Sequence, residues 1–242
     1  MEAWSSWAGK AIIKPRKRYN TRMRFSISLW IWFGNYAASV LLPNLTCTFV
    51  FMLSTFPLMQ WAQKLYANGP LWPYHHWSHT WEVALRSQQL ALQMGLDGHQ
   101  CSLLRAAAYC HDLGHLVKSA EHEALSVEMA KPIWDELGFS QWDQEQMAAA
   151  IRATRIPQKA DDLMAQILCD ADLFYLGGPD YYPQAEKLYR EMKMRGSSLS
   201  RREWLDLQIH FLEQHHYWTE PARPREKEKQ KRLEELKNQA NK

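Results

Sequence analysis

A histidine and an aspartate stand side by side in the stretch AAAYCHDLGH, at the end of a segment apolar enough to be a buried helix. Asp, Gly and His often gather where a buried helix reaches the surface, which would give His111 and Asp112 no special role. The chain, however, contains further residues that could share a site with this pair. An imidazole nitrogen beside a carboxylate oxygen is a combination of ligands that divalent metal ions accept.

Candidate partners for the pair lie both upstream and downstream. The segment YHHWSHT spaces His75 and His79 by four, so both lie on one face if the segment begins a helix. The segment ILCDADLFYL sets Asp170 and Asp172 in an otherwise apolar run, where a buried carboxylate is costly without a cation or hydrogen-bond donors. A capping histidine or an aspartate at a helix end would explain each segment alone, but together they predict one site.

One histidine from the first segment and one aspartate from the second complete a plausible ligand set. His79 and Asp172, added to His111 and Asp112, give two imidazole nitrogens and two carboxylates, with Asp170 as the alternative last aspartate. Such mixed ligation suits Mn²⁺, Fe²⁺, Zn²⁺, Co²⁺ or Mg²⁺. The residues therefore predict a divalent metal site, without fixing the ion or whether one or two are bound.

The elements that would position these residues are helical. The segment HTWEVALRSQQLALQMG places apolar residues at helical spacing, and the next helix runs through LLRAAAYC into the His-Asp pair. No run of alternating β-branched residues indicates a strand. Three helix starts carry a capping residue with its partner three positions later: Asp97 with Gln100, Ser140 with Asp143, and Ser200 with Glu203. The sequence thus predicts an all-α domain.

The order H…HD…D, carried by His79, His111-Asp112 and Asp172, resembles the HD superfamily of metal-dependent phosphohydrolases, whose members are all-α. The resemblance is closest to the small, mostly bacterial predicted HD hydrolases. It extends from YHHWSHTWEV through CHDLGH, EHEALS, IRATRIPQK and ILCDADLFYLG to REWLDLQIHFLEQHHYWT and KQKRLEELK. We therefore expect an HD-domain helical bundle.

The resemblance implies that these four residues bind the metal and that Asp112 could bridge a second ion. It favours Asp172 over Asp170, because the family's last aspartate usually falls in the A-D-L context. The segment from Tyr74 to His79 also resembles the Y-H-N-x-x-H run of related phosphodiesterases, in which the first histidine looks like the proton donor. The resemblance therefore implies a catalytic role for His75. His76 stands here in place of the asparagine.

The remaining histidines are weaker candidates. His122, in EHEALS, lies where some HD enzymes add a ligand for a second metal, although a surface histidine at a helix start is an equal alternative. Four others do not stand at a suitable spacing from another candidate ligand and are interpreted as packing or surface residues: His115, His210, His215 and His216.

The function implied by the resemblance is metal-dependent hydrolysis of a phosphate ester by metal-activated water, with His75 and Asp112 taking part in catalysis. The substrate would be a nucleotide or another small phosphorylated metabolite. The alternative is an HD-fold nucleotide-sensing or signalling module that binds without turnover. The chain carries no Gly-rich phosphate loop, Walker motif or G-x-S-x-G elbow.

The chain divides into three expected parts: a basic and apolar extension over residues 1–63, the HD domain over 64–222, and an exposed charged helix over 223–242. Residues 25–63 contain no charged residue and follow the basic run KPRKRYNTRMR, a pattern that can anchor a protein on the cytoplasmic side of a membrane. One alternative is an apolar extension packed on the domain. The other is that this stretch is upstream sequence not normally part of the protein, whose working start is then Met52 or Met59.

Charge and cysteine usage narrow the range of partners and compartments. Basic residues concentrate in residues 1–24 and 223–242, which leaves the body between them net acidic, so a nucleic-acid partner is not expected. The four cysteines are widely spaced and form no C-x-x-C pair, which argues against a zinc ribbon or a disulfide framework. We expect a protein of the cytoplasm, or of the cytoplasmic membrane face, that acts on a small phosphorylated substrate.

Overall fold

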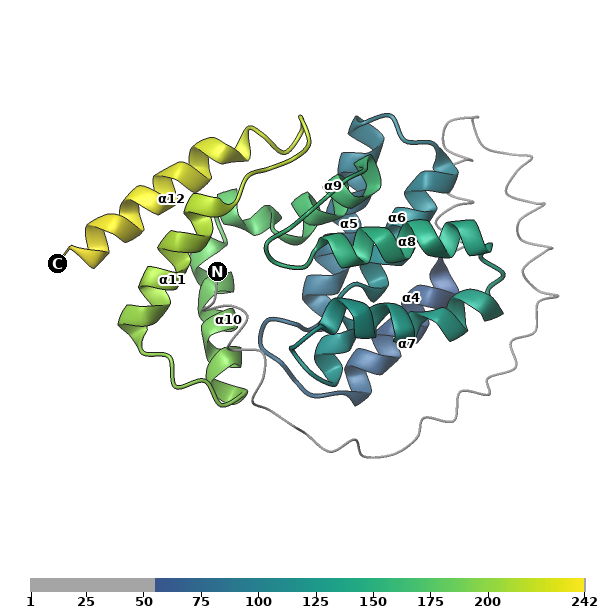
Figure 1. Ribbon diagram of the computed structural model, residues 1–242, viewed down its shortest axis with the longest axis horizontal. Helices are drawn as coiled ribbons and strands as arrows, with labels where there is room; N and C mark the ends of the chain where they lie inside the picture. Colours follow the sequence, from purple (N-terminus) through teal and green to yellow (C-terminus); the bar gives the residue numbers. More distant parts are fainter. Residues whose placement is uncertain (1–54, 242) are drawn as a thin grey trace.

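The computed structural model describes residues 55–241, and every regular element in that range is a helix (Figure 1). The prediction of an all-α protein is therefore confirmed. The first six elements are α4 (Phe56–Asn68), α5 (Trp77–Gln93), α6 (Gly98–Cys110), η1 (Leu113–Leu116, a 3₁₀ helix), α7 (His122–Glu136) and α8 (Gln141–Ala153). They are followed by α9 (Leu163–Asp172), η2 (Phe174–Gly177, also 3₁₀), α10 (Tyr181–Met194), α11 (Arg201–Gln214) and α12 (Arg225–Ala240).

The helix starts follow the predicted capping residues. The side chain of each cap accepts a hydrogen bond from the backbone N–H three residues later, and the later side chain accepts one from the backbone N–H of the cap. This reciprocal pairing is present in all three predicted boxes: Asp97 with Gln100, Ser140 with Asp143, and Ser200 with Glu203. Local sequence thus determines where α6, α8 and α11 begin.

The main hydrophobic core surrounds α6, which is buried at every position from residue 101 to 110. Ala106, Ala107 and Ala108 are fully buried, and their small side chains allow α5, α8 and α9 to approach the helix closely. Because α6 ends at Cys110, the residues that follow emerge inside the core. The His-Asp pair therefore starts from the centre of the bundle.

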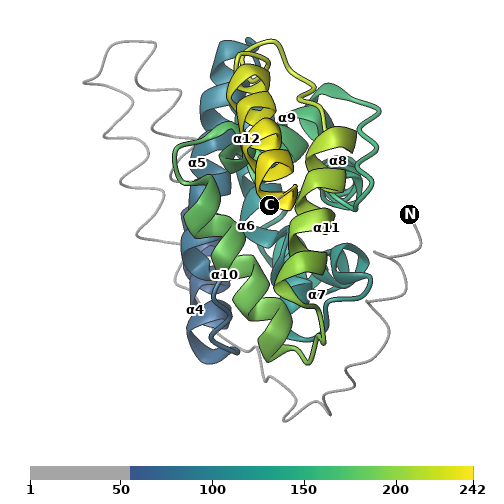
Figure 2. The ribbon, with the colours of Figure 1, turned by 90° about the vertical axis from the view of Figure 1, so that its left-hand side faces the viewer.

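A second core lies between α10, α11 and α12 and includes Leu176 of η2. When the left-hand side of Figure 1 faces the viewer, these three helices lie in front of the others (Figure 2). Leu233 and Leu236 of α12 are buried, and even Lys229 is only 4% exposed. The expectation that this helix is simply exposed is therefore wrong, because one of its faces packs on α11 and η2.

The region predicted as an N-terminal extension lies mostly outside the described residues. From Phe56 onward it forms α4, whose residues Leu58, Ala62 and Tyr66 are buried against the main core. The expected boundary at residue 63 thus falls inside a packed helix. None of the helices between residues 55 and 241 combines the length and the apolar character that crossing a bilayer requires.

Candidate metal centre

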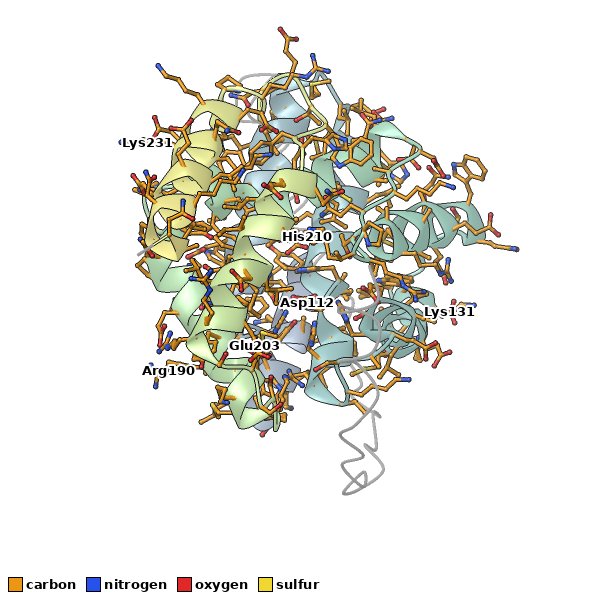
Figure 3. All side chains as sticks on the ribbon, turned by 60° about the vertical axis from the view of Figure 1, so that its left-hand side comes forward. Asp112, Lys131, Arg190, Glu203, His210 and Lys231 are labelled. Carbon is orange, nitrogen blue, oxygen red and sulfur yellow. The ribbon has the colours of Figure 1, made fainter. Side chains whose placement is uncertain are left out.

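Four side chains from three helices converge on one small volume. His79 lies in the first turn of α5, His111 and Asp112 follow the end of α6, and Asp172 is the last residue of α9. One potential ligand atom from each lies within 4.8 Å of the others. None of the four exposes more than 15% of its side chain. Figure 3 shows Asp112 inside the bundle, whereas the labelled Lys131, Arg190 and Lys231 reach its periphery.

The distances within the group are those of a compact site. His79 Nε2 lies 3.1 Å from Asp172 Oδ1 and 3.4 Å from Asp112 Oδ2. His111 Nε2 lies 3.2 Å from Asp112 Oδ2 and 3.5 Å from Asp172 Oδ1. Each imidazole nitrogen therefore faces both carboxylates. The packing of α5 against α6 and α9 brings the three segments together.

The orientation of His111 fits a metal ligand. Its Nδ1–H donates to the backbone carbonyl of Ala108 at 2.8 Å, which fixes the ring and leaves Nε2 as the ligand atom. This Nε2 is fully buried and has no aligned hydrogen-bond partner in the part of the chain that the structure describes. A buried polar atom with no well-aligned hydrogen bond is costly, and a cation between it and the carboxylates would remove that cost. Two nitrogen and two oxygen donors also suit the ions predicted from the sequence.

Without a metal, the group resembles two buried ion pairs. Burial disfavours the charged imidazolium, but hydrogen bonds to Asp112 and Asp172 outweigh it and raise the pKa of His79 to about 9. Burial also opposes protonation of His111, but Asp112, and to a lesser degree Asp172, outweigh it and raise the pKa of His111 well above its usual value. Burial likewise opposes ionisation of Asp172, yet His111 and His79 lower its pKa to about 2. Protonated His79 and His111 thus balance the charges of the two carboxylates, and a divalent ion that bound there would displace these protons.

Of the two candidate aspartates, the structure brings Asp172 to the cluster and leaves Asp170 outside it. Asp170 instead accepts hydrogen bonds from the backbone N–H groups of Trp218 and Thr219, at 2.8 and 2.7 Å. The hydroxyl of Thr219 donates a third, at 2.7 Å. Asp170 therefore ties α9 to the segment before α12.

A second group of side chains adjoins the first on the other side of Asp112. His75, Asp112 and His115 also place ligand atoms close enough to hold a cation. The ring of His115 stacks on that of His75, with centroids 3.5 Å apart, and lies 3.8 Å from that of His122. His122 Nε2 is 3.6 Å from Asp112 Oδ1. The structure thus places His122 beside Asp112, while His115 is buried in a cluster of histidines rather than on the surface.

Burial, followed by the nearby charges of His75 and His122, lowers the pKa of His115 well below its usual value. The other three histidines interpreted as packing or surface residues stay apart from this cluster. His210 and His216 are exposed, and the carbonyl of His215 accepts a hydrogen bond from Lys229.

A glycine brings α7 next to the His-Asp turn. The backbone N–H of Gly114 donates to Ser126 Oγ at 2.8 Å. A Cβ atom added at Gly114 would lie only 2.1 Å from the carbonyl oxygen of His122. The close approach of the two segments, and with it the position of His122, therefore requires the absence of a side chain at residue 114.

His75 is oriented by a buried carboxylate that sequence reasoning did not identify. Its Nδ1–H donates to Glu191 Oε1 at 2.6 Å, and Glu191 Oε2 accepts the backbone N–H groups of Tyr74 and His75. Arg195 donates to the same carboxylate at 2.8 Å. Burial opposes ionisation of Glu191, but His75 and Arg195 lower its pKa to about 2. The free nitrogen of His75 lies 4.0 Å from Asp112 Oδ2.

A cleft of about 530 Å³ reaches two of the four clustered side chains. His79 and Asp172 line it together with residues of α5, η2 and α10, and Arg225 of α12 contributes to its wall. Its volume falls in the range of sites for small molecules. A small substrate in this cleft could therefore contact the site through His79 and Asp172.

Comparison with known proteins agrees with the geometry. Residues 77–175, which include the four clustered residues, match the HD domain family. A crystal structure of a predicted HD superfamily hydrolase from an uncultured Thermotogales bacterium has a similar fold, with a TM-score of 0.52 and 19% identity over 76% of this chain and 88% of that one. A comparison with curated proteins finds no match. Residues 77–175 thus carry an HD domain, and the four clustered residues lie inside it.

Proposed function

We propose that the protein hydrolyses a phosphate ester, of a nucleotide or another small phosphorylated metabolite, with a divalent metal ion held by His79, His111, Asp112 and Asp172. The observation that carries the proposal is the convergence of four ligand atoms within 4.8 Å of one another, in which the buried Nε2 of His111 faces two carboxylates, beside a cleft of substrate size. A bound divalent ion would polarise phosphoryl oxygens and lower the pKa of a coordinated water toward neutrality.

His75 is the proposed proton donor to the leaving oxygen. Glu191 accepts a hydrogen bond from Nδ1, so Nε2 is the nitrogen left to carry the transferred proton. The position of Glu191 is fixed in turn by Arg195 and by two backbone N–H groups. A positioned acid of this kind contributes roughly 10²–10⁴ in rate.

A substrate panel tests the reaction directly. The purified chain, loaded in turn with each candidate metal, is given nucleoside mono-, di- and triphosphates, cyclic nucleotides and aryl phosphates, and released phosphate or alcohol is measured. We expect turnover of at least one class. If metal-loaded protein releases nothing, the hydrolase proposal is wrong, and tight binding of a nucleotide without turnover would favour the sensing module.

The role of His75 is tested with a matched pair of variants. His75→Asn should keep the metal and lower kcat by roughly 100-fold, with a smaller loss for nitrophenyl esters because their leaving group needs no proton. His76→Asn is the control, because His76 caps α5 by accepting from the Ser78 N–H and asparagine is an equally good cap. Equal losses in both variants, or loss of metal in His75→Asn, would contradict this role.

Glu191 is proposed as a positioning residue that acts through His75. Glu191→Gln should therefore lower kcat while metal content stays constant. In the His75→Asn background, the same substitution should cause little further loss, since the two residues form one unit. Additive losses would show that Glu191 acts on the site by another route.

A further inference from the structure

Two arginines line the same cleft as the metal-binding residues His79 and Asp172. Arg86 comes from α5 and Arg225 from the first position of α12. Arg86 Nη1 donates to the side chain of Gln89 at 2.9 Å. Arg225 donates to the backbone carbonyl of Gly177 at 3.0 Å. Between residues 55 and 241, no carboxylate lies within 4.0 Å of either guanidinium, although Asp180 also lines the cleft and its charge acts on Arg225.

The ring of Phe174 in η2 brings these two charges together. The Arg225 guanidinium lies 3.6 Å from the ring centroid, and that of Arg86 lies 4.9 Å from it. Burial lowers the pKa of Arg225; Tyr217 and Asp180 oppose this shift, and the charge of Arg86 adds to it. Two like charges held near one ring repel each other, and an anion bound between them would relieve that repulsion.

The position of Arg86 on α5 indicates how long a ligand must be to contact both His79 and Arg86. His79 and Arg86 are seven residues apart, which is two helical turns, so they share a face and are separated by about 10 Å along the axis. Glu82 lines the cleft between them, one turn from each. A carboxylate there disfavours an anion in the middle of the ligand, while it can accept a hydrogen bond from a hydroxyl or amine.

The charge of the arginine pair indicates which anion it would bind. Two guanidinium groups match the charge of about −1.5 to −2 on a phosphate monoester better than the single charge of a carboxylate. Their planar donor groups also suit bidentate contact with phosphate oxygens.

We propose that Arg86 and Arg225 bind a second, non-reacting phosphate of the substrate, about 10 Å from the phosphate cleaved at the metal centre and separated from it by an uncharged portion. This inference rests on the proposed hydrolase function. It deepens that function by restricting the substrate class to bisphosphorylated molecules with well-separated phosphates, and it disfavours contiguous polyphosphates.

Alkanediol bisphosphates of graded length test this inference. The metal-loaded full chain is given the bisphosphates of propanediol, hexanediol and nonanediol, with the matching alkyl monophosphates, and KM and kcat are measured. Binding of the same compounds is measured separately by calorimetry. We expect a longer bisphosphate to have a KM at least roughly 10-fold below that of its monophosphate. Propanediol bisphosphate, which is too short, should gain little.

Substitution of Arg86 assigns the gain to the arginine pair. Arg86 is exposed, and within residues 55–241 it donates a hydrogen bond only to Gln89, so Arg86→Gln should fold normally. The Arg86→Gln substitution should weaken binding of the longer bisphosphate about 10-fold more than binding of the monophosphate. Arg225→Lys provides a second variant that keeps the charge and loses the planar donors. Arg152→Gln, an exposed arginine in the last turn of α8, is the matched control and should leave the gain intact.

The outcomes separate this inference from the proposed reaction. If monophosphates are hydrolysed but a second phosphate brings no Arg86-dependent gain at any length, the anion site is wrong and the hydrolase proposal stands. If no ester is hydrolysed but calorimetry shows an Arg86-dependent gain in binding, the anion site stands and the reaction is wrong. An equal gain from hexyl phosphate with a terminal carboxylate would overturn the assignment to phosphate.

Discussion

Asp170 and Asp172 stand two residues apart near the end of α9, and their surroundings differ in kind. Asp170 is fully buried and accepts hydrogen bonds from three fixed donors, supplied by Trp218 and Thr219. Asp172 faces two histidine nitrogens, which can carry or release a proton, and one edge of it lines the cleft. The first carboxylate links two parts of the chain, whereas the second can exchange protons for a metal.

The two carboxyl groups also respond oppositely to their environments. Burial raises the pKa of Asp170 even though donors from residues 218 and 219 oppose it. For Asp172, burial acts in the same direction, but His111 and His79 outweigh it and lower the pKa to about 2. Burial alone therefore does not distinguish a structural carboxylate from a proposed metal ligand. The two are distinguished by their partners, which are backbone N–H groups and a hydroxyl for Asp170 and histidine nitrogens for Asp172.

The largest effect we expect is on metal binding. Asp172→Ala and His111→Ala should each lower metal affinity by more than about 100-fold, because each removes one of the four proposed ligands. Asp170→Ala should keep its metal as long as the protein is folded. Metal titration of the apoprotein measures all three, and elemental analysis of the purified proteins provides an independent value. Equal loss in the two aspartate variants would remove the distinction between them.

The second effect is on stability, and here the order of the two aspartates reverses. Asp170→Ala leaves three buried donors without an acceptor and should lower the free energy of unfolding by about 3 kcal/mol. Asp172→Ala should cost less in metal-free protein, because His79 and His111 can lose their protons once the carboxylate is gone. Urea unfolding with a chelator present compares the two variants without a contribution from bound metal. A larger cost for Asp172→Ala would contradict the comparison.

The third effect is the pH dependence of the metal-free protein. The pKa of His79 is raised to about 9 from 6.5, so its stabilising contribution is complete below pH 6.5 and lost as the pH rises through 9. The pKa of Asp172 is lowered to about 2 from 3.8, so its contribution is present above pH 3.8 and lost as the pH falls through 2.

Thermal unfolding from neutral to alkaline pH tests the His79 contribution. The metal-free protein should lose on the order of 1 kcal/mol or more across this interval. The metal-loaded protein should not follow it, because metal competes with protons for the same atoms and binds better as they leave. Parallel curves with and without metal would show that the titrating groups lie elsewhere.

The smallest effect concerns a single hydrogen bond to Asp170. Thr219→Val removes the hydroxyl donor and keeps both backbone donors, so it should lower the free energy of unfolding by about 1 kcal/mol. Metal affinity should stay at its wild-type value. A change in metal affinity would indicate that the link through Asp170 also positions Asp172.

The sequence predicts best the features that depend on near neighbours. Each capping box spans four residues, and all three predicted boxes are present. The choice between Asp170 and Asp172 is not local, because the donors that occupy Asp170 lie 48 and 49 residues further along the chain. The residues alone left both open, and the A-D-L context of the family favoured Asp172.

The side chains that sequence reasoning missed depend on distant contacts. Glu191 lies in the charged helix α10, where nothing local separates it from Glu186, and its partner His75 is 116 residues away. His115 has no repeating spacing, but a short 3₁₀ helix returns it to the site three residues after Asp112. Arg225 belongs to a segment whose mixed charge is typical of a solvated helix. Its position beside Phe174 follows only from the tertiary packing.

The contact at Gly114 limits how the site could be re-engineered. A designer who wished to change the selectivity for metals would naturally vary the histidines and aspartates themselves. Residue 114 offers no such freedom, since even one added methyl group would overlap the backbone of His122 and push α7 outward. A library randomised around the His-Asp turn should therefore hold this glycine fixed and reach the histidine cluster through positions 115 and 122.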